Sequence, residues 1–383
     1  SQALYVTSGA DPRAFRAAIT FGLSSGSWSM HYRDETTQRP IAFSRFPRAS
    51  LNSQDTPVIP VGSGATNGSE LVSHMPSFGY LPFLITGRLW FWEECAFWTT
   101  RAYLGATSAQ RFESASVFDS ANGAFANRGA AWSLRALAET LALCPQEDPS
   151  LPEWRSAWES NARHYRAKYV DGTAFGGTTF GGAWISPQGF LGDYSSLGTS
   201  AYPPPGSSNA WFGAAWMQAF HVQVWGHTSN IGLPVSAAGL ADHIAVRNHA
   251  YRQPVARSGD GGAYNWRRFV VYSYPIGADA SRLPPSTWFT AAQSYAEVVS
   301  GFGLSNLSSA TGATLKAHSS DDDLLSGSSS VEFGAQQLSG LALAAQHGAP
   351  GAAEGWARVT GASNFASSFE QFLNDNPEHA IGF

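Results

Sequence analysis

The residues best suited to acid–base chemistry in this sequence are histidines and tyrosines near helix starts and in a glycine-rich loop. His74 stands just before a predicted helix, and Tyr80 follows within two helical turns. His221 lies in a later, largely apolar helix, and Tyr264 lies in the loop GDGGAYNWRRF. Imidazole and phenol groups transfer protons in general acid–base catalysis, so we predict these four as catalytic residues.

Cationic, amide and indole side chains in the same regions could hold an acidic sugar. A guanidinium or amide group binds a carboxylate, and an indole offers a flat apolar face for stacking. The predicted substrate-binding residues are Arg128, Trp211, Asn265, Trp266 and Arg267. Structural roles remain open for several of the predicted residues: His74 could cap its helix, and Trp211 and His221 could belong to a core stripe with Gln218 and Trp225.

Two adjacent carboxylates, Glu93 and Glu94, lie in a predicted helix that is apolar nearly all round. Buried carboxylates are usually paired, which favours salt bridges with nearby arginines such as Arg128 and Arg135. The alternative is a catalytic carboxylate. An inverting glycoside hydrolase needs two carboxyl groups about 6.5–9.5 Å apart, and the residues that could supply them are Glu94, Asp193 and Asp260.

Several common catalytic and ligand-binding motifs are absent from the sequence. We find no HExxH motif, P-loop, GxGxxG motif or EF-hand loop. No Cys/His spacing suggests zinc, and the acidic stretch SDDDLL lacks the ligand spacing of a calcium loop. We therefore predict neither a metal site nor a cofactor.

The elements that must position these residues are mainly helices, often in pairs. Gly87 is a plausible helix C-cap, and a first helix is predicted to begin near Asp11. Between the helices run a glycine-rich loop over 171–208 and an extended segment over 263–277. The remaining predicted helices span 76–87, 88–105, 127–145, 151–170, 209–227, 235–253, 285–303, 331–348 and 350–361.

Composition narrows the class of protein. Charged residues make up 13% of the 383 residues, against roughly 25% in average proteins, while aromatic residues also reach 13%. A net charge of −5 and a pI near 6.0 argue against nucleic acid as a partner, and no apolar run could span a membrane. This balance suits a secreted or periplasmic protein that handles sugars. Cys95 and Cys144 could form one disulfide or remain free thiols.

Three helical stretches, HMPSFGYLPFLITG, NRGAAWSLRALAETLAL and LSGLALAAQHGAPGAAEGWARV, resemble the repeats of (α/α)-toroid enzymes that act on polysaccharides. That group includes lyases and some glycoside hydrolases. In several toroid lyases an Asn-His pair followed by a tyrosine belongs to the catalytic group, and RNHAYR (Asn248, His249 and Tyr251) has the same order. The resemblance implies an inner ring of helices around a cavity.

We therefore expect a mainly α protein with an (α/α)-toroid catalytic domain over 66–383 and an irregular N-terminal segment over 1–65 packed on it. The expected function is cleavage of a uronate-containing polysaccharide by β-elimination. An inverting glycoside hydrolase on the same fold and a non-catalytic carbohydrate-binding module remain the alternatives. The expected partner is a polysaccharide or oligosaccharide, and the chain could belong to a longer protein with further domains.

Overall fold

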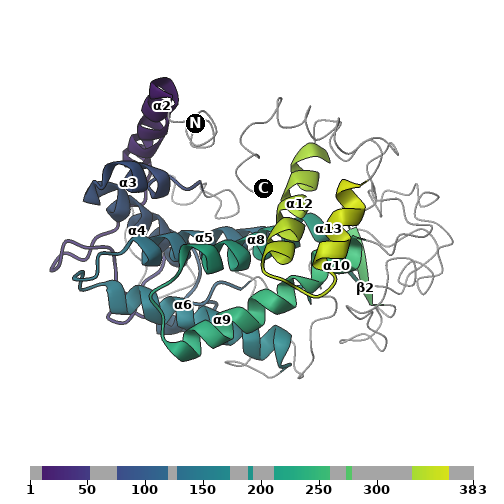
Figure 1. The fold of residues 1–383 in the computed structure, drawn as a ribbon. Helices are drawn as coiled ribbons and strands as arrows, with labels where there is room; N and C mark the ends of the chain where they lie inside the picture. The colour runs from purple at the N-terminus through teal and green to yellow at the C-terminus, as the bar shows by residue number, and fades with distance from the viewer. Residues whose placement is uncertain are drawn as a thin grey trace. The chain divides into compact units, whose positions relative to one another are not determined.

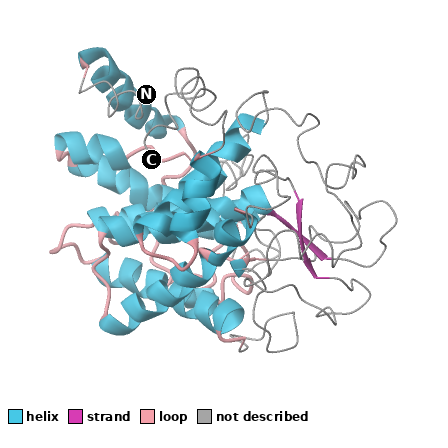
Figure 2. Ribbon diagram, turned by 45° about the vertical axis from the view of Figure 1, so that its right-hand side comes forward, coloured by secondary structure: helices cyan, strands magenta, loops and turns pink. Residues whose placement is uncertain are grey.

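A computed structural model describes residues 11–51, 76–119, 127–172, 189–192, 211–258, 273–277 and 330–361. Helices account for most of this part of the chain, and the two strands stand out against them (Figure 2). The prediction of a mainly helical protein is confirmed. Among the described residues no helix has both the length and the apolar character that a bilayer crossing requires.

The chain forms two compact units, and each is built from two stretches of sequence. Unit 1 comprises residues 1–165 and 228–243, and unit 2 comprises residues 166–227 and 244–383. The division does not follow the sequence order, because the chain leaves unit 1, returns to it and leaves it again.

Unit 1 is a set of helices packed in the order in which they occur. Helices α3 and α4 pack against each other, α4 packs on α5, and α5 packs on α6 (Figure 1). The elements described in this unit are α2 (Pro12–Leu23), η1 (Ser24–Ser27), α3 (Tyr80–Thr86), α4 (Leu89–Leu104), η3 (Glu113–Ala115), α5 (Asn127–Leu143) and α6 (Leu151–Tyr165).

Local sequence signals account for the ends of the first helices. The Asp11 carboxylate accepts a hydrogen bond of 2.7 Å from the Arg13 amide, and Pro12 occupies the first position of α2. Gly87 ends α3 in the left-handed conformation, with a φ of 66°. The predicted start near Asp11 and the predicted C-cap at Gly87 are both confirmed.

Helix α4 is buried on nearly every side, as its apolar sequence predicts. It packs between α3 and α5, and two of its polar side chains, Trp92 and Thr99, find partners on α5. The Trp92 indole donates to the Thr140 carbonyl at 3.0 Å, and the Thr99 and Thr140 hydroxyls lie 2.9 Å apart. These bonds satisfy polar atoms that would otherwise be costly inside an apolar interface.

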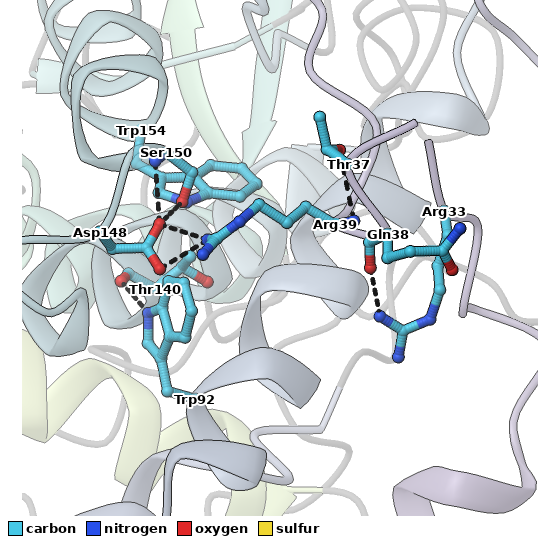
Figure 3. Close-up of polar contacts among 9 residues, drawn as sticks. All are labelled: Arg33, Thr37, Gln38, Arg39, Trp92, Thr140, Asp148, Ser150 and Trp154. Atoms are coloured by element: carbon cyan, nitrogen blue, oxygen red, sulfur yellow. Dashed lines mark hydrogen bonds and ion pairs between the residues drawn. The ribbon is translucent and has the colours of Figure 1, made fainter. Parts of the chain in front are cut away.

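Side-chain contacts tie the N-terminal segment to the helices of unit 1 (Figure 3). Arg39 donates from one nitrogen to both oxygens of Asp148, at 2.7 and 2.6 Å. Ser150 also donates to Asp148, from its amide and its hydroxyl, and receives a bond from the Trp154 indole. Burial would raise the pKa of Asp148, but these hydrogen bonds outweigh it and hold the pKa below its ordinary value.

A buried arginine fastens the same segment at a second place. The Arg111 side chain is fully buried and donates to the carbonyls of Pro47 and Ala49 at 2.8 and 2.6 Å. It also reaches the carbonyls of Tyr103 and Ala106, at the end of α4, at 3.4 and 3.1 Å. One guanidinium thus bridges the N-terminal segment and α4.

Unit 2 combines helices with a two-stranded antiparallel sheet. In this unit α12 packs on α13 and α10 packs on α12 (Figure 1), while Phe212 pairs with Pro275 in the sheet. The elements that lie in this unit or enter it are η5 (Arg166–Val170, a π-helical turn), β1 (Trp211–Ala214), α8 (Ala215–Ile231), α9 (Ala237–Ala250), α10 (Arg252–Arg257), β2 (Ser273–Gly277), α12 (Ser330–Gln346) and α13 (Ala352–Thr360).

The helix predicted over 209–227 needs a correction. Its first residues form β1, and the helix begins only at Ala215 and runs on to Ile231. Pairing of β1 with β2 explains the difference, because β2 falls within the extended segment predicted over 263–277 and its backbone offers partners to β1. The helix predicted over 285–303 lies outside the described residues.

The two cysteines are free thiols in the structure. Cys95 is buried in α4, whereas Cys144 is half-buried just after α5. The sequence allowed either one disulfide or two free thiols, and the structure has two free thiols. Burial raises the pKa of Cys144 to about 12, so its thiol stays protonated at neutral pH.

Candidate functional site

The candidate site lies in unit 1, where the chain that leads into α3 meets α4 and α5. Gly79 precedes Tyr80, the first residue of α3, and its backbone lies directly on α4. A Cβ atom at Gly79 would sit 2.0 Å from the Phe91 carbonyl oxygen and 2.8 Å from the Cys95 sulfur. Only glycine permits this approach, which brings Tyr80 close to the buried face of α4.

A buried carboxyl group on α5 is the centre of the site. Glu139 accepts a 2.6 Å hydrogen bond from the Ser77 hydroxyl, and its other oxygen lies 3.7 Å from the Arg135 Nε. The Glu139 side chain is 7% exposed. Burial raises the pKa of Glu139, and the Arg135 charge and the Ser77 hydrogen bond only partly offset that effect.

The Glu139 carboxyl group also raises the pKa values of two neighbouring side chains. Burial raises the pKa of Tyr80 to about 12, and the Glu139 charge adds to the effect. Burial also raises the pKa of the Cys95 thiol, again with a contribution from Glu139. At neutral pH the phenol and the thiol therefore keep their protons, and the phenol is half-buried rather than sealed in the core.

The cationic side of the site is formed by α5. Arg135 stacks on the Trp132 indole, with 3.9 Å from its guanidinium carbon to the ring centroid. Burial lowers the pKa of Arg135, against the opposing charge of Glu139. Arg128 lies two turns earlier on α5 and is half-buried, as are Trp132 and Arg135. Arg128 and Arg135 are seven residues apart on this continuous helix and therefore lie on one face of it.

This arrangement can do acid–base chemistry. Tyr80 offers a protonated hydroxyl, Glu139 offers a carboxyl group whose pKa is raised, and Arg135 offers positive charge. Titratable groups with shifted pKa values that share one partly accessible site are typical of active sites. Within the described residues no group of histidine, cysteine, aspartate and glutamate side chains could hold a metal ion.

Glu94, which the sequence predicted to pair with arginines, has a different partner in the structure. Glu94 is buried, and both of its oxygens lie 3.0 Å from the Nε2 of His31. The sequence predicted arginine partners for Glu94, and the partner that the structure gives is this histidine of the N-terminal segment, while Arg135 faces Glu139. The His31 side chain is 28% exposed and packs its ring edge-on against Phe97.

The predicted site residues that the structure describes are divided between the two units. Tyr80 and Arg128 belong to unit 1, whereas His221 and Trp211 belong to unit 2. His221 is 1% exposed in α8, which argues against direct contact with a polymer. Trp211 lies in β1, so it does not extend the helical stripe of Gln218, His221 and Trp225, whose members are all buried.

The Gln218 amide has a structural task. It donates to the Leu191 carbonyl and accepts from the Leu191 amide, both at 2.8 Å. A buried polar group in the stripe is therefore used to hold a loop rather than a sugar. The other predicted site residues, His74, Tyr264, Asn265, Trp266 and Arg267, lie outside the described residues, as do Asp193 and Asp260.

Glu139 is the functional candidate that the sequence did not reveal. Its partner Ser77 lies 62 positions earlier, so no local pattern links the two. The available signal was the spacing of Arg135 and Glu139, four residues apart on one helix, which predicts a side-chain pair. The rest of this helix is rich in alanine and leucine, which indicates that the pair lies against an apolar interface.

No known protein family, curated protein or solved structure matches the chain.

Proposed function

We propose that the protein cleaves a uronate-containing polysaccharide by β-elimination, with the site around Tyr80 as its active centre. The observation that carries the proposal is the half-buried Tyr80 phenol, whose pKa the Glu139 charge helps to raise, together with Arg135, which faces that carboxyl group. β-Elimination needs a base for the C5 proton, an acid for the leaving oxygen and a cation for the uronate carboxylate.

The roles follow from the charges of the groups. Tyr80 keeps its proton at neutral pH because its pKa is raised to about 12, so it can donate to the departing glycosidic oxygen. Arg128 is the proposed partner of the uronate carboxylate, since Arg135 already faces Glu139. His74, six residues before Tyr80 in the sequence, is the proposed base for the C5 proton.

The helix pairs of the chain fit the (α/α) toroid that the sequence resembles, and we propose that arrangement for the whole catalytic domain. A low content of charged residues and 14 tryptophans support a secreted or periplasmic protein that works on sugars. The polymer itself is proposed only by class, as one that carries uronate residues.

A glycoside hydrolase is the second candidate, and Glu139 is the observation that favours it. A buried carboxyl group with a raised pKa is the form that a general acid takes in glycosidases. The hydrolase would use Glu139 to protonate the leaving oxygen. It would need a second carboxylate about 6.5–9.5 Å away to activate water if it inverts the anomeric centre.

One experiment separates the two functions. The protein is incubated with a panel of uronate polysaccharides, and the ultraviolet absorbance of the unsaturated product is followed together with new reducing ends. The lyase gives both signals, and Tyr80→Phe abolishes them while the circular dichroism spectrum is unchanged. Reducing ends without the absorbance, lost in Glu139→Gln, would establish the hydrolase. Binding without either signal would leave a carbohydrate-binding module and refute both enzymes.

A further inference from the structure

A second cluster of titratable side chains joins the N-terminal segment to α4. The Nε2 of His31 lies 3.0 Å from both oxygens of Glu94, whose side chain is only 2% exposed. The His31 ring also meets the Phe97 ring edge-on, with 5.1 Å between the two centroids, and the His31 side chain is 28% exposed. The cluster therefore connects a carboxyl group inside the protein to an imidazole that solvent can reach.

The two ring nitrogens of His31 have different surroundings. The oxygens of an ionised Glu94 can only accept hydrogen bonds, so Nε2 carries the proton that lies between them. Within the described part of the chain the other nitrogen, Nδ1, makes no hydrogen bond. A carboxylate that bonds one nitrogen of an imidazole fixes the orientation of the ring. Glu94 thus holds His31 in a position in which Nδ1 is the atom left for a ligand.

A guanidinium group is fixed on the same aromatic ring. Arg33 is exposed, and its guanidinium carbon lies 4.3 Å from the centroid of the buried Phe97 ring. One of its nitrogens donates to the Gln38 carbonyl at 2.6 Å (Figure 3). No carboxylate among the described residues pairs with Arg33. Because His31 and Arg33 are two residues apart and contact one ring, their donor groups are neighbours.

The other charged groups around the cluster come from the same two elements. On the N-terminal segment, Asp34 is buried and paired with Arg45, while Glu35 is exposed. On α4, Glu93 is half-buried and Arg101 is buried. None of these five groups bonds to the imidazole or to the guanidinium of the cluster. The positive charge of the cluster is therefore not neutralised by an ion pair with a neighbouring carboxylate.

The charges of the cluster favour a ligand with a single negative charge. A protonated His31 and an ionised Glu94 cancel each other, and Arg33 leaves one positive charge. A singly charged anion would neutralise the site, whereas a dianion would place a net negative charge next to a buried carboxylate. A carboxylate group also has two oxygens, one for the Nδ1–H of the imidazolium and one for the guanidinium.

We propose that His31 and Arg33 form a binding site for the carboxylate group of a small molecule. Glu94 is a positioning residue, since it holds the imidazole without touching the ligand. The ligand binds when His31 is protonated, because only then does Nδ1 carry a hydrogen to donate, and an imidazole ordinarily exchanges this proton near neutral pH. The site does not depend on the proposed function, because it uses none of the residues of the Tyr80 site.

The test uses the full chain with histidine ring carbons labelled for NMR, and His31→Gln identifies the His31 signal by its loss. Sodium acetate is titrated at about pH 5.5 and about pH 8, on either side of the ordinary range of imidazole titration. Acetamide is the neutral isostere, and sodium sulfate supplies a dianion at the same ionic strength. We expect acetate to shift the His31 signal saturably, with binding about tenfold or more weaker at the higher pH. Acetamide should give no saturable shift.

Arg33→Gln should weaken acetate binding about tenfold or more, equal to about 1.4 kcal/mol. Arg48→Gln is the matched control, because Arg48 is an exposed arginine of the same segment and its loss changes the net charge equally. It should leave acetate binding within about twofold. Equal losses in the two arginine variants would overturn the proposal. In the unaltered protein, equal responses to acetate and acetamide, sulfate binding as tight as acetate binding, or acetate binding that ignores pH would do the same.

Discussion

Gly79 offers the sharpest test of how the Tyr80 site is built. A methyl group at this position would lie 2.0 Å from the Phe91 carbonyl oxygen and 2.8 Å from the Cys95 sulfur. The Gly79 φ of −94° suits any residue, so Gly79→Ala adds no backbone strain. Only the lack of space opposes it, and the segment before α3 must move off α4 to accept the methyl group.

The expected magnitude follows from these contacts. Overpacking of this kind costs about 1–3 kcal/mol, while the lost flexibility of the unfolded chain returns about 0.4–1 kcal/mol. We therefore expect Gly79→Ala to lower the free energy of unfolding by about 1–2 kcal/mol. Movement of the segment should also separate Ser77 from Glu139 and uncover the Cys95 thiol, which lies beneath Gly79.

The assay combines denaturant unfolding with the rate at which Cys95 reacts with a thiol reagent, both in a Cys144→Ser background. Gly87→Ala is the matched control: Gly87 has a φ of 66° and no atom within 4 Å of a Cβ, so its substitution costs backbone strain alone, about 1 kcal/mol. Both variants should lose stability, but only Gly79→Ala should speed the Cys95 reaction. A Gly79→Ala protein with the wild-type Cys95 rate and a loss below about 0.5 kcal/mol would refute the reasoning.

Three further outcomes are expected. Arg111→Ala should lower the free energy of unfolding by about 3 kcal/mol or more, since charged hydrogen bonds contribute about 1.5–3 kcal/mol each, and faster amide exchange at Leu51 should accompany it. Ultraviolet titration should give Tyr80 a pKa near 12, and Glu139→Gln should lower it, with Tyr80→Phe identifying the signal. Asp148→Asn should destabilise the protein at pH 7, and the loss should shrink as the pH falls through the pKa of the Asp148 carboxyl. The reason is that a carboxyl group with a lowered pKa stabilises the fold only above that pKa. Equal losses at pH 7 and below the carboxyl pKa would contradict this.

Local signals in the sequence predict much of the helical framework. Asp11 followed by proline marks a helix start, and Gly87 marks a helix end, because each acts on its own backbone. The apolar character of α4 on all sides likewise predicts its burial. These features depend on residues a few positions apart, which is the range over which sequence patterns are informative.

The features that the sequence missed depend on distant partners. Trp211 has helical spacing to Gln218, yet pairing with β2, more than 60 residues away, puts it in a strand. Glu139 has its role through Ser77, and Glu94 finds His31 rather than an arginine. Nearby residues in the sequence do not specify such distant partners. The role of Glu139 in the site can therefore be recognised only from the packed helices.

The path of the chain between the two units has a consequence for any attempt to divide the protein. The unit boundaries fall at 165/166, 227/228 and 243/244, and the last two lie inside α8 and α9. A cut there would break a helix in its interior, leaving unpaired backbone groups on both sides. A truncated chain that contains only one unit would therefore end in a broken helix, and screens for a minimal active fragment should keep both units whole.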